Sequence, residues 1–60
     1  MRIDKKDIGN YIMLKRRNMK LSQSDLAKAT GLSKTTIQKI EAGTGNIGIN
    51  SYIKLLHKLS

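Results

Sequence analysis

Four stretches of the chain repeat apolar residues at the spacing of an α-helix, and short polar or glycine-containing segments separate them. The first helix starts after Asp4 and runs to about Asn18, and the others cover about 23–30, 34–42 and 49–59. Apolar residues three or four positions apart place one face of each segment against a core. No alternation of β-branched residues lasts more than a few positions. The pattern therefore predicts an all-α fold, a small bundle of four helices.

The same spacing predicts which side chains face the core. In the first helix the inward stripe has Lys15 in its middle, with its ammonium reaching solvent, and contains Ile8, Tyr11, Ile12 and Met19. In the last helix the inward positions are Ile49, Tyr52, Ile53, Leu56 and Leu59. We place Leu55 and Leu59 at the edge of that stripe, where a further element or a second subunit would cover them.

Local signals mark where the helices begin and end. Asp4 with Asp7, and Ser22 with Asp25, have the three-residue spacing of a capping box. Gly31 and Gly43 follow two of the helices, where a left-handed residue ends a helix. Apolar pairs that can close a hydrophobic staple flank all four starts: Ile3 with Ile8, Leu21 with Leu26, Leu32 with Ile37, and Ile47 with Tyr52. We therefore expect four separately capped helices.

The segment from Leu21 to Gly43, LSQSDLAKATGLSKTTIQKIEAG, predicts two short helices joined by a tight glycine turn, which is a helix-turn-helix. It resembles the lambda-repressor and Cro family of DNA-binding domains over about residues 8–59. The matching features are Leu21-Ser22-Gln23, Leu26-Ala27, Gly31-Leu32-Ser33, Ile37, Ile40 and Glu41-Ala42-Gly43. The resemblance implies five helices with the third in the DNA major groove; we expect four of them, without the fifth, within these 60 residues.

Length, net charge and residue composition restrict the classes of protein to which this chain can belong. The 60 residues allow one small domain, 1–60, whose core must be aliphatic because there are two Tyr and no Phe or Trp. Twelve Lys and Arg against four acids give a net charge of +8, which favours a polyanionic partner. The chain has no Cys, no apolar run long enough for a membrane span and no signal-peptide pattern. These features suit a cytoplasmic protein without disulfides or cofactors.

Residues at the exposed start of the third helix are the candidates for reading DNA bases. Lys34 can donate to guanine, Gln38 can pair with adenine, and Thr35 can contact a base edge or a thymine methyl group. Thr36 is a weaker candidate. The alternative for each is an ordinary solvated helix surface.

Other polar residues are candidates for contacts with DNA phosphates. Gln23, at the first position of the second helix, matches the glutamine that contacts the DNA backbone in the family, and the helix N-terminus offers free N–H groups. Lys39, Thr44 and Asn46 are further candidates from the third helix and the loop after it. For Arg17 and Lys20 we expect solvated charges.

The resemblance also implies a structural ion pair between Arg16 and Glu41, which would tie the first helix to the third. No residues suggest catalysis or a metal site. His57 is the single histidine, it has no cysteine or acid near it in sequence, and we expect it on the surface. The four acids form no catalytic pair.

The sequence therefore predicts a bacterial or phage regulator that binds double-stranded DNA, most simply a repressor, with helix 34–42 in the major groove and no enzymatic activity. An alternative is the antitoxin of a toxin–antitoxin pair, with helix 49–59 available for the toxin or for a homodimer. Another is a protein-interaction module that reuses the fold, although Lys34 and Lys39 count against it. A cationic peptide on a membrane surface would need one continuous apolar stripe rather than four capped helices.

Overall fold

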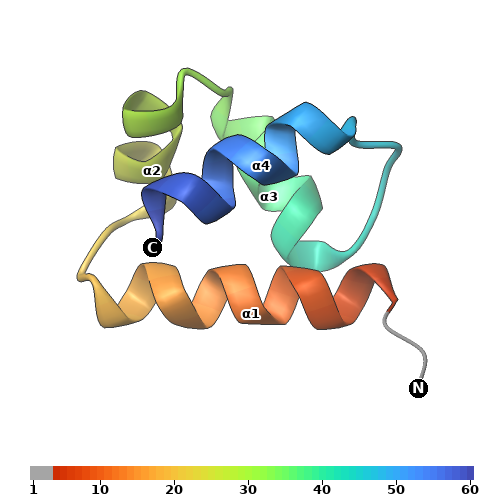
Figure 1. Cartoon of the computed structure of the whole chain (residues 1–60), viewed down its shortest axis with the longest axis horizontal. Coiled ribbons are helices and arrows are strands. Elements are labelled where there is room, and N and C mark those ends of the chain that lie inside the picture. The colour runs from red at the N-terminus through yellow and green to blue at the C-terminus, as the bar shows by residue number, and fades with distance from the viewer. Residues whose placement is uncertain (1–3) are drawn as a thin grey trace.

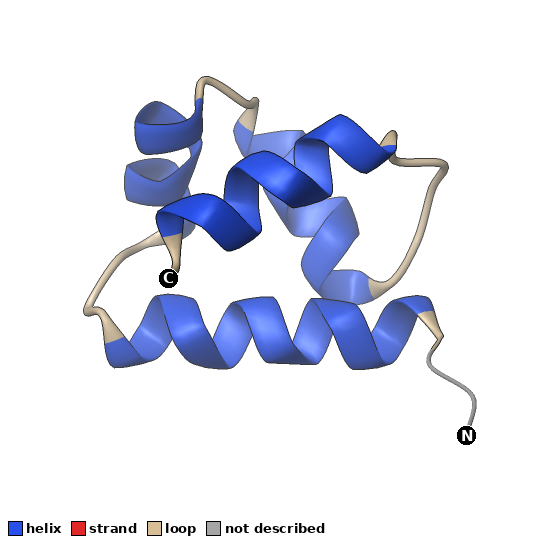
Figure 2. Ribbon diagram, in the orientation of Figure 1, coloured by secondary structure: helices blue, strands red, loops and turns tan. Residues whose placement is uncertain are grey.

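A computed structural model describes residues 4–60, which form four α-helices and no strand. The helices are α1 (Lys5–Asn18), α2 (Gln23–Thr30), α3 (Lys34–Ala42) and α4 (Ile49–Lys58). The helix α1 lies along one side of the domain and the three shorter helices lie across it, with α4 in front of α3 (Figures 1 and 2). The all-α prediction is confirmed. No helix within residues 4–60 is both long and apolar enough to cross a bilayer.

The first two helices begin with the capping boxes that the sequence predicts. Asp4 accepts a hydrogen bond from the amide of Asp7 and donates its own amide to the Asp7 carboxylate, both at 3.2 Å. Ser22 and Asp25 make the same reciprocal pair at 3.0 and 2.9 Å. These bonds satisfy amides that have no partner within the helix. The apolar pair predicted at the first start includes Ile3, which lies outside the described residues.

The later helices are bounded by one serine cap and by glycines. The hydroxyl of Ser33 accepts from the amide of Thr36 at 3.1 Å. Gly31 and Gly43 both have the left-handed conformation, with φ of 75° and 74°, which an L side chain rarely adopts. The helix α4 starts at the N-cap Gly48, between the predicted staple residues Ile47 and Tyr52, and this N-cap makes no side-chain hydrogen bond because glycine has no side chain.

The core is aliphatic, as the composition requires. All four helices contribute to the buried set Ile12, Leu26, Ala27, Ile37, Ile40, Leu55 and Leu59. Half-buried apolar residues close its edges, namely Ile8, Leu21, Leu32, Ile47 and Tyr52. The second set includes members of the predicted staple pairs, so the apolar residue beside a helix start also serves the shared core.

The inward face of α4 differs from the prediction. Leu55 and Leu59, expected at the edge, are buried in the core. Ile49, Ile53 and Leu56, expected inside, keep 70%, 55% and 42% of their surface exposed. The apolar side of this helix is wider than its neighbours can cover, and α4 packs with the half that carries Leu55 and Leu59. These two leucines are therefore not free to meet a second subunit.

The inward face of α1 differs in a similar way. Tyr11 and Met19 are exposed, although the helical spacing places them beside Ile12. The helix is turned so that Gly9 and Arg16, both buried, lie against α3. Lys15 is half-buried and its ammonium lies 5.9 Å from the centre of the Tyr11 ring, so its charge stays near the surface as expected.

Candidate nucleic-acid interface

The turn between α2 and α3 fixes the direction of α3. Gly31 takes the left-handed conformation at the end of α2, and Ser33 starts α3 two residues later. The buried Ile37 and Ile40 then hold α3 against the core by one face. The opposite face of α3 is left in solvent.

The outer face of α3 carries the residues predicted to read DNA bases. Lys34, Thr35 and Gln38 are exposed, as is Lys39, which was predicted to contact phosphate. Among the described residues none of these four side chains is engaged in a hydrogen bond or ion pair, so their donors and acceptors are available. Thr36 differs, because it is half-buried and its hydroxyl lies 2.8 Å from that of Ser33. Its hydroxyl is therefore engaged with the N-cap residue Ser33 and is less available to a ligand than the other side chains.

Arg16 and Glu41 form a buried ion pair between α1 and α3. The Arg16 Nε donates to Glu41 Oε2 at 2.7 Å and Nη2 donates to Oε1 at 3.1 Å, so the contact is bidentate. Arg16 Nη1 donates to the carbonyl of Leu21 at 2.8 Å. The two side chains are only 11% and 6% exposed, so this pair differs from the weak ion pairs of protein surfaces.

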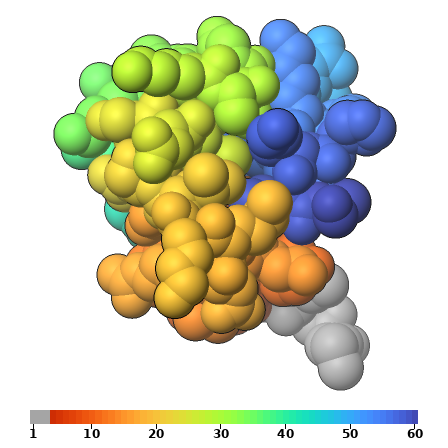
Figure 3. Space-filling model, turned by 90° about the vertical axis from the view of Figure 1, so that its left-hand side faces the viewer, coloured from red at the N-terminus to blue at the C-terminus, as the bar shows by residue number. Residues whose placement is uncertain are grey.

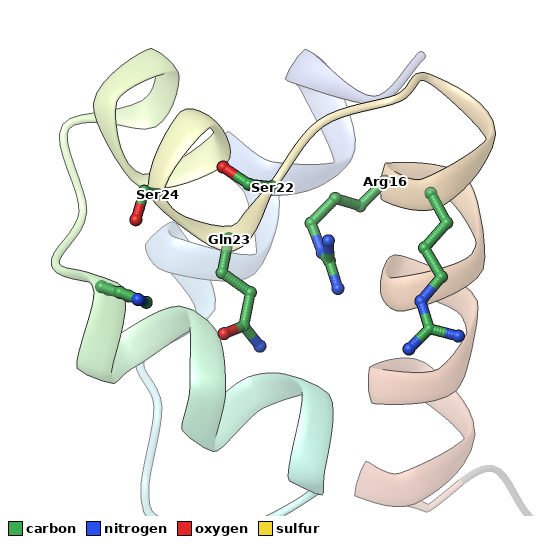
Figure 4. A pocket seen from close by; sticks show the side chains of 6 residues that line it. Arg16, Ser22, Gln23 and Ser24 are labelled. Atoms are coloured by element: carbon green, nitrogen blue, oxygen red, sulfur yellow. The ribbon is translucent and has the colours of Figure 1, made fainter.

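A polar recess lies between α1, the start of α2 and the start of α3, and Figure 4 shows it from close by. Its cavity volume is about 420 Å³. The residues that line it are all polar or cationic: Arg16, Arg17, Ser22, Gln23, Ser24 and Lys34. Arg16 is neutralised by Glu41, whereas Arg17 and Lys34 have no carboxylate partner within residues 4–60. The recess therefore has the charge to receive an anion.

The start of α2 adds dipoles to this recess. The amides of Gln23 and Ser24 belong to the first turn, where a helix makes no internal N–H bonds. They contribute positive partial charge at the mouth of the recess. The capping hydrogen bonds from Ser22, chiefly from its amide, hold the pKa of the Asp25 carboxyl below its ordinary value. The cap therefore stays intact at neutral pH.

Gln23 has a partner that the sequence did not predict. Its Nε2 donates to Glu41 Oε1 at 3.1 Å, which links the start of α2 to the ion pair. The side chain is half-buried and lines the recess. The predicted contact between Gln23 and phosphate stays a prediction, now with its amide held in a defined place.

The two loop candidates for phosphate contact are in different situations. The amide of Thr44 donates to the carbonyl of Lys39 at 2.9 Å and its hydroxyl to the same oxygen at 3.5 Å, so Thr44 helps to close the end of α3. Asn46 is exposed and makes no side-chain hydrogen bond within residues 4–60. Of the two, Asn46 has the freer side chain.

The sequence reasoning missed part of this site. Arg17, treated as a solvated charge, lines the recess together with Ser22 and Ser24. One signal could have found it: Arg17 lies in the last turn of α1, five residues before Ser22, so the short connection keeps it near the start of α2. Within residues 4–60, no three of His, Cys, Asp and Glu lie together as a metal site would require.

Comparison with known proteins gives one finding for the family. The chain matches a family model described as helix-turn-helix over residues 12–60, which is most of its length. A search of curated proteins gives no match. The matched region contains the second half of α1, then α2, the Gly31 turn, α3 and α4. The chain therefore belongs to the helix-turn-helix family of the lambda-repressor and Cro type, a family of DNA-binding regulators.

Proposed function

We propose that this protein is a sequence-specific transcription regulator, of the repressor type, that inserts α3 into the major groove of double-stranded DNA. The observation that carries the proposal is the outer face of α3, where Lys34, Thr35, Gln38 and Lys39 are exposed and have no partner among the described residues. Side chains of these types match the donors and acceptors of base edges and phosphates.

Charge supports DNA over a protein partner as the ligand of this face. The acid of α3, Glu41, is turned inward and paired with Arg16, so it does not offset Lys34 and Lys39. A positive helix face is attracted to the phosphates on both sides of the major groove. A module that reads another protein would not need this arrangement.

We assign the polar recess to a phosphate of the DNA backbone. Gln23 and Arg17 supply donors there, and the recess adjoins the start of α3 through Lys34. An anchor beside the reading helix fixes the register of that helix on the bases without reading sequence itself. Phosphate contacts of this kind also make binding sensitive to salt.

The proposal is tested by selecting bound duplexes from random double-stranded DNA. We expect a defined sequence motif of a few base pairs, which is the length that one short helix can read. A palindromic motif would indicate that two copies bind together, as in helix-turn-helix dimers, and a single half-site would indicate a monomer. Recovery of random sequences only would contradict sequence-specific binding. A promoter overlapping the motif then tests repression by reporter expression in bacterial cytoplasm.

Two glutamine substitutions separate base reading from anchoring. Gln38→Ala should weaken binding to the selected duplex by about 1–3 kcal/mol and relax the preference at one base position. Gln23→Ala should weaken binding to selected and random duplexes by similar factors, because all sequences present the same phosphates. Asn50→Ala removes an exposed amide from α4 and is the control, with no change expected. If Gln38→Ala weakened binding to selected and random duplexes by the same factor, Gln38 would not be a residue that reads a base.

A further inference from the structure

The carboxylate of Glu41 joins three helices through three hydrogen bonds. Two come from the guanidinium of Arg16 on α1, and one comes from the side-chain amide of Gln23 on α2. Glu41 itself belongs to α3, and its side chain is almost completely buried. The ion pair with Arg16 is by itself sufficient to tie α3 to α1 through the Glu41 side chain. The bond to Gln23 has a different consequence, because Gln23 lines the recess and Glu41 does not.

The bond determines which way the Gln23 amide faces. A carboxylate only accepts hydrogen bonds, so the nitrogen of the amide must turn toward Glu41 and the oxygen must turn away. Figure 4 shows the Gln23 nitrogen on the side of Arg16 and the oxygen on the opposite side. The nitrogen carries two hydrogens, and Glu41 uses one of them. The second remains for an anion in the recess.

The hydrogen bond to Glu41 also orders the Gln23 side chain before DNA binds. A free glutamine side chain has many rotamers, and ordering it during binding lowers affinity. The bidentate contact with Arg16 keeps the Glu41 carboxylate in place, and the carboxylate keeps the Gln23 amide in place. Glu41 thus prepares a donor for the recess without being part of its lining.

We infer that Glu41 is a positioning residue for DNA binding: it orients Gln23 toward the backbone phosphate, in addition to pairing with Arg16. The inference rests on the proposed DNA-binding function and deepens it. It differs from a purely structural role, in which Glu41 would only stabilise the fold and would affect DNA binding equally whether Gln23 is present or absent.

A double-mutant cycle in DNA affinity tests the inference. The parent, Glu41→Gln, Gln23→Ala and the double variant are titrated with the selected duplex at one salt concentration. An amide at position 41 has one accepting oxygen with two lone pairs, so it cannot accept from all three N–H donors, and its own NH₂ group would face at least one of them. We expect Glu41→Gln to weaken binding by roughly three- to tenfold with Gln23 present, which lies within the range of coupling between neighbouring residues. In the Gln23→Ala background the loss should be below twofold.

Two further variants control for the change in net charge and for a failure to fold. Asp7→Asn changes the net charge by the same amount as Glu41→Gln but lies in the exposed cap of α1, so its effect should be small and independent of Gln23. Glu41→Asp keeps a carboxylate for Arg16 and is one methylene shorter. It gives the same cycle if Glu41→Gln does not fold, which thermal melting of the helical circular dichroism signal shows.

The outcomes distinguish the inference from the proposed function. Equal losses with and without Gln23 overturn the positioning role and leave DNA binding standing. A parent that binds no duplex overturns both. In the free protein, the side-chain amide resonances of Gln23 in nitrogen-edited NMR spectra should shift in the Glu41 variants and not in Asp7→Asn. Unchanged resonances would also overturn the inference.

Discussion

At the scale of single residues, Gly9 sets how closely α1 and α3 can approach. A Cβ built on Gly9 would overlap the carbonyl oxygen of Ile40 and lie 2.8 Å from that of Glu41. These neighbours are backbone atoms, which cannot move aside as a flexible side chain can. Arg16 is two helical turns further along the same face of α1. The absence of a side chain at Gly9 therefore lets Arg16 reach the carboxylate of Glu41.

Gly9→Ala is predicted to destabilise the domain. Forcing one methyl group into a closely packed contact costs about 1–3 kcal/mol, because the two helices must separate. Urea unfolding followed by circular dichroism measures the change. Asn10→Ala, at the exposed neighbouring position of α1, is the control and should leave the midpoint nearly unchanged. An unchanged midpoint for Gly9→Ala would show that the helices adjust without cost.

At the scale of helices, α4 is the element with the least local support. The N-caps of the other three helices are Asp4, Ser22 and Ser33, and each accepts a hydrogen bond through its side chain. Gly48 has the extended conformation of a cap, with φ of −66° and ψ of 150°, but no side chain. The helix is held mainly by the burial of its apolar face.

Gly48→Ser is predicted to stabilise the protein. There is open space where the new Cβ would lie, and the backbone already has the conformation of a serine cap. The hydroxyl would accept from the amide of Ser51, and the unfolded chain would lose the freedom of a glycine. Together these effects contribute about 0.5–1 kcal/mol, measurable as a higher midpoint of urea unfolding. A lower midpoint would mean that the cap geometry is not reached.

The two faces of α4 make a matched pair of substitutions. Leu55→Ala empties a fully buried site and should cost about 2–5 kcal/mol, much of the stability of so small a domain. Ile53→Ala removes a similar side chain from the exposed face and should change stability by about 0.5 kcal/mol or less. The two midpoints of unfolding are compared directly. Equal losses would mean that α4 packs with a different face.

At the scale of the whole molecule, the four acids all serve the fold. Asp4, Asp7 and Asp25 take part in helix caps, and Glu41 pairs with Arg16. None of them pairs with another cation within residues 4–60. The remaining basic side chains are therefore not neutralised by the protein itself, and the net charge of +8 acts on the surroundings.

Salt dependence should distinguish this general charge from the local contacts of the recess. If about four phosphates are neutralised, the logarithm of the affinity falls with that of the salt concentration with a slope of roughly −3.6. Arg17→Ala should reduce that slope by about 0.9, because it removes one phosphate contact. Lys54→Ala removes the same charge from α4, which lies on the other side of α2 from α3 in Figure 3, and should leave the slope nearly unchanged. Equal changes would show that net charge alone determines the attraction.

Signals within a few residues of one another were enough to predict the four helices and the family. Capping boxes at Asp4 and Ser22 and left-handed glycines at Gly31 and Gly43 depend on neighbours within a few residues, so the sequence contains all the information they need. The outward positions of α3 followed in the same way, because Ile37 and Ile40 had to face the core. The helix caps, the left-handed glycines and the outward face of α3 could therefore be predicted without knowing how the helices pack.

Which part of each apolar face is buried, and which polar groups meet, depends on how the helices pack against one another. The apolar sides of α1 and α4 are wider than the core, and the packing of neighbours selected Leu55 over Ile53 and left Tyr11 exposed. The bond from Gln23 to Glu41 and the recess beside Arg17 join residues from separate helices. Helical spacing gives the direction of a side chain relative to its own helix axis, and only the packing of the helices fixes what that direction meets.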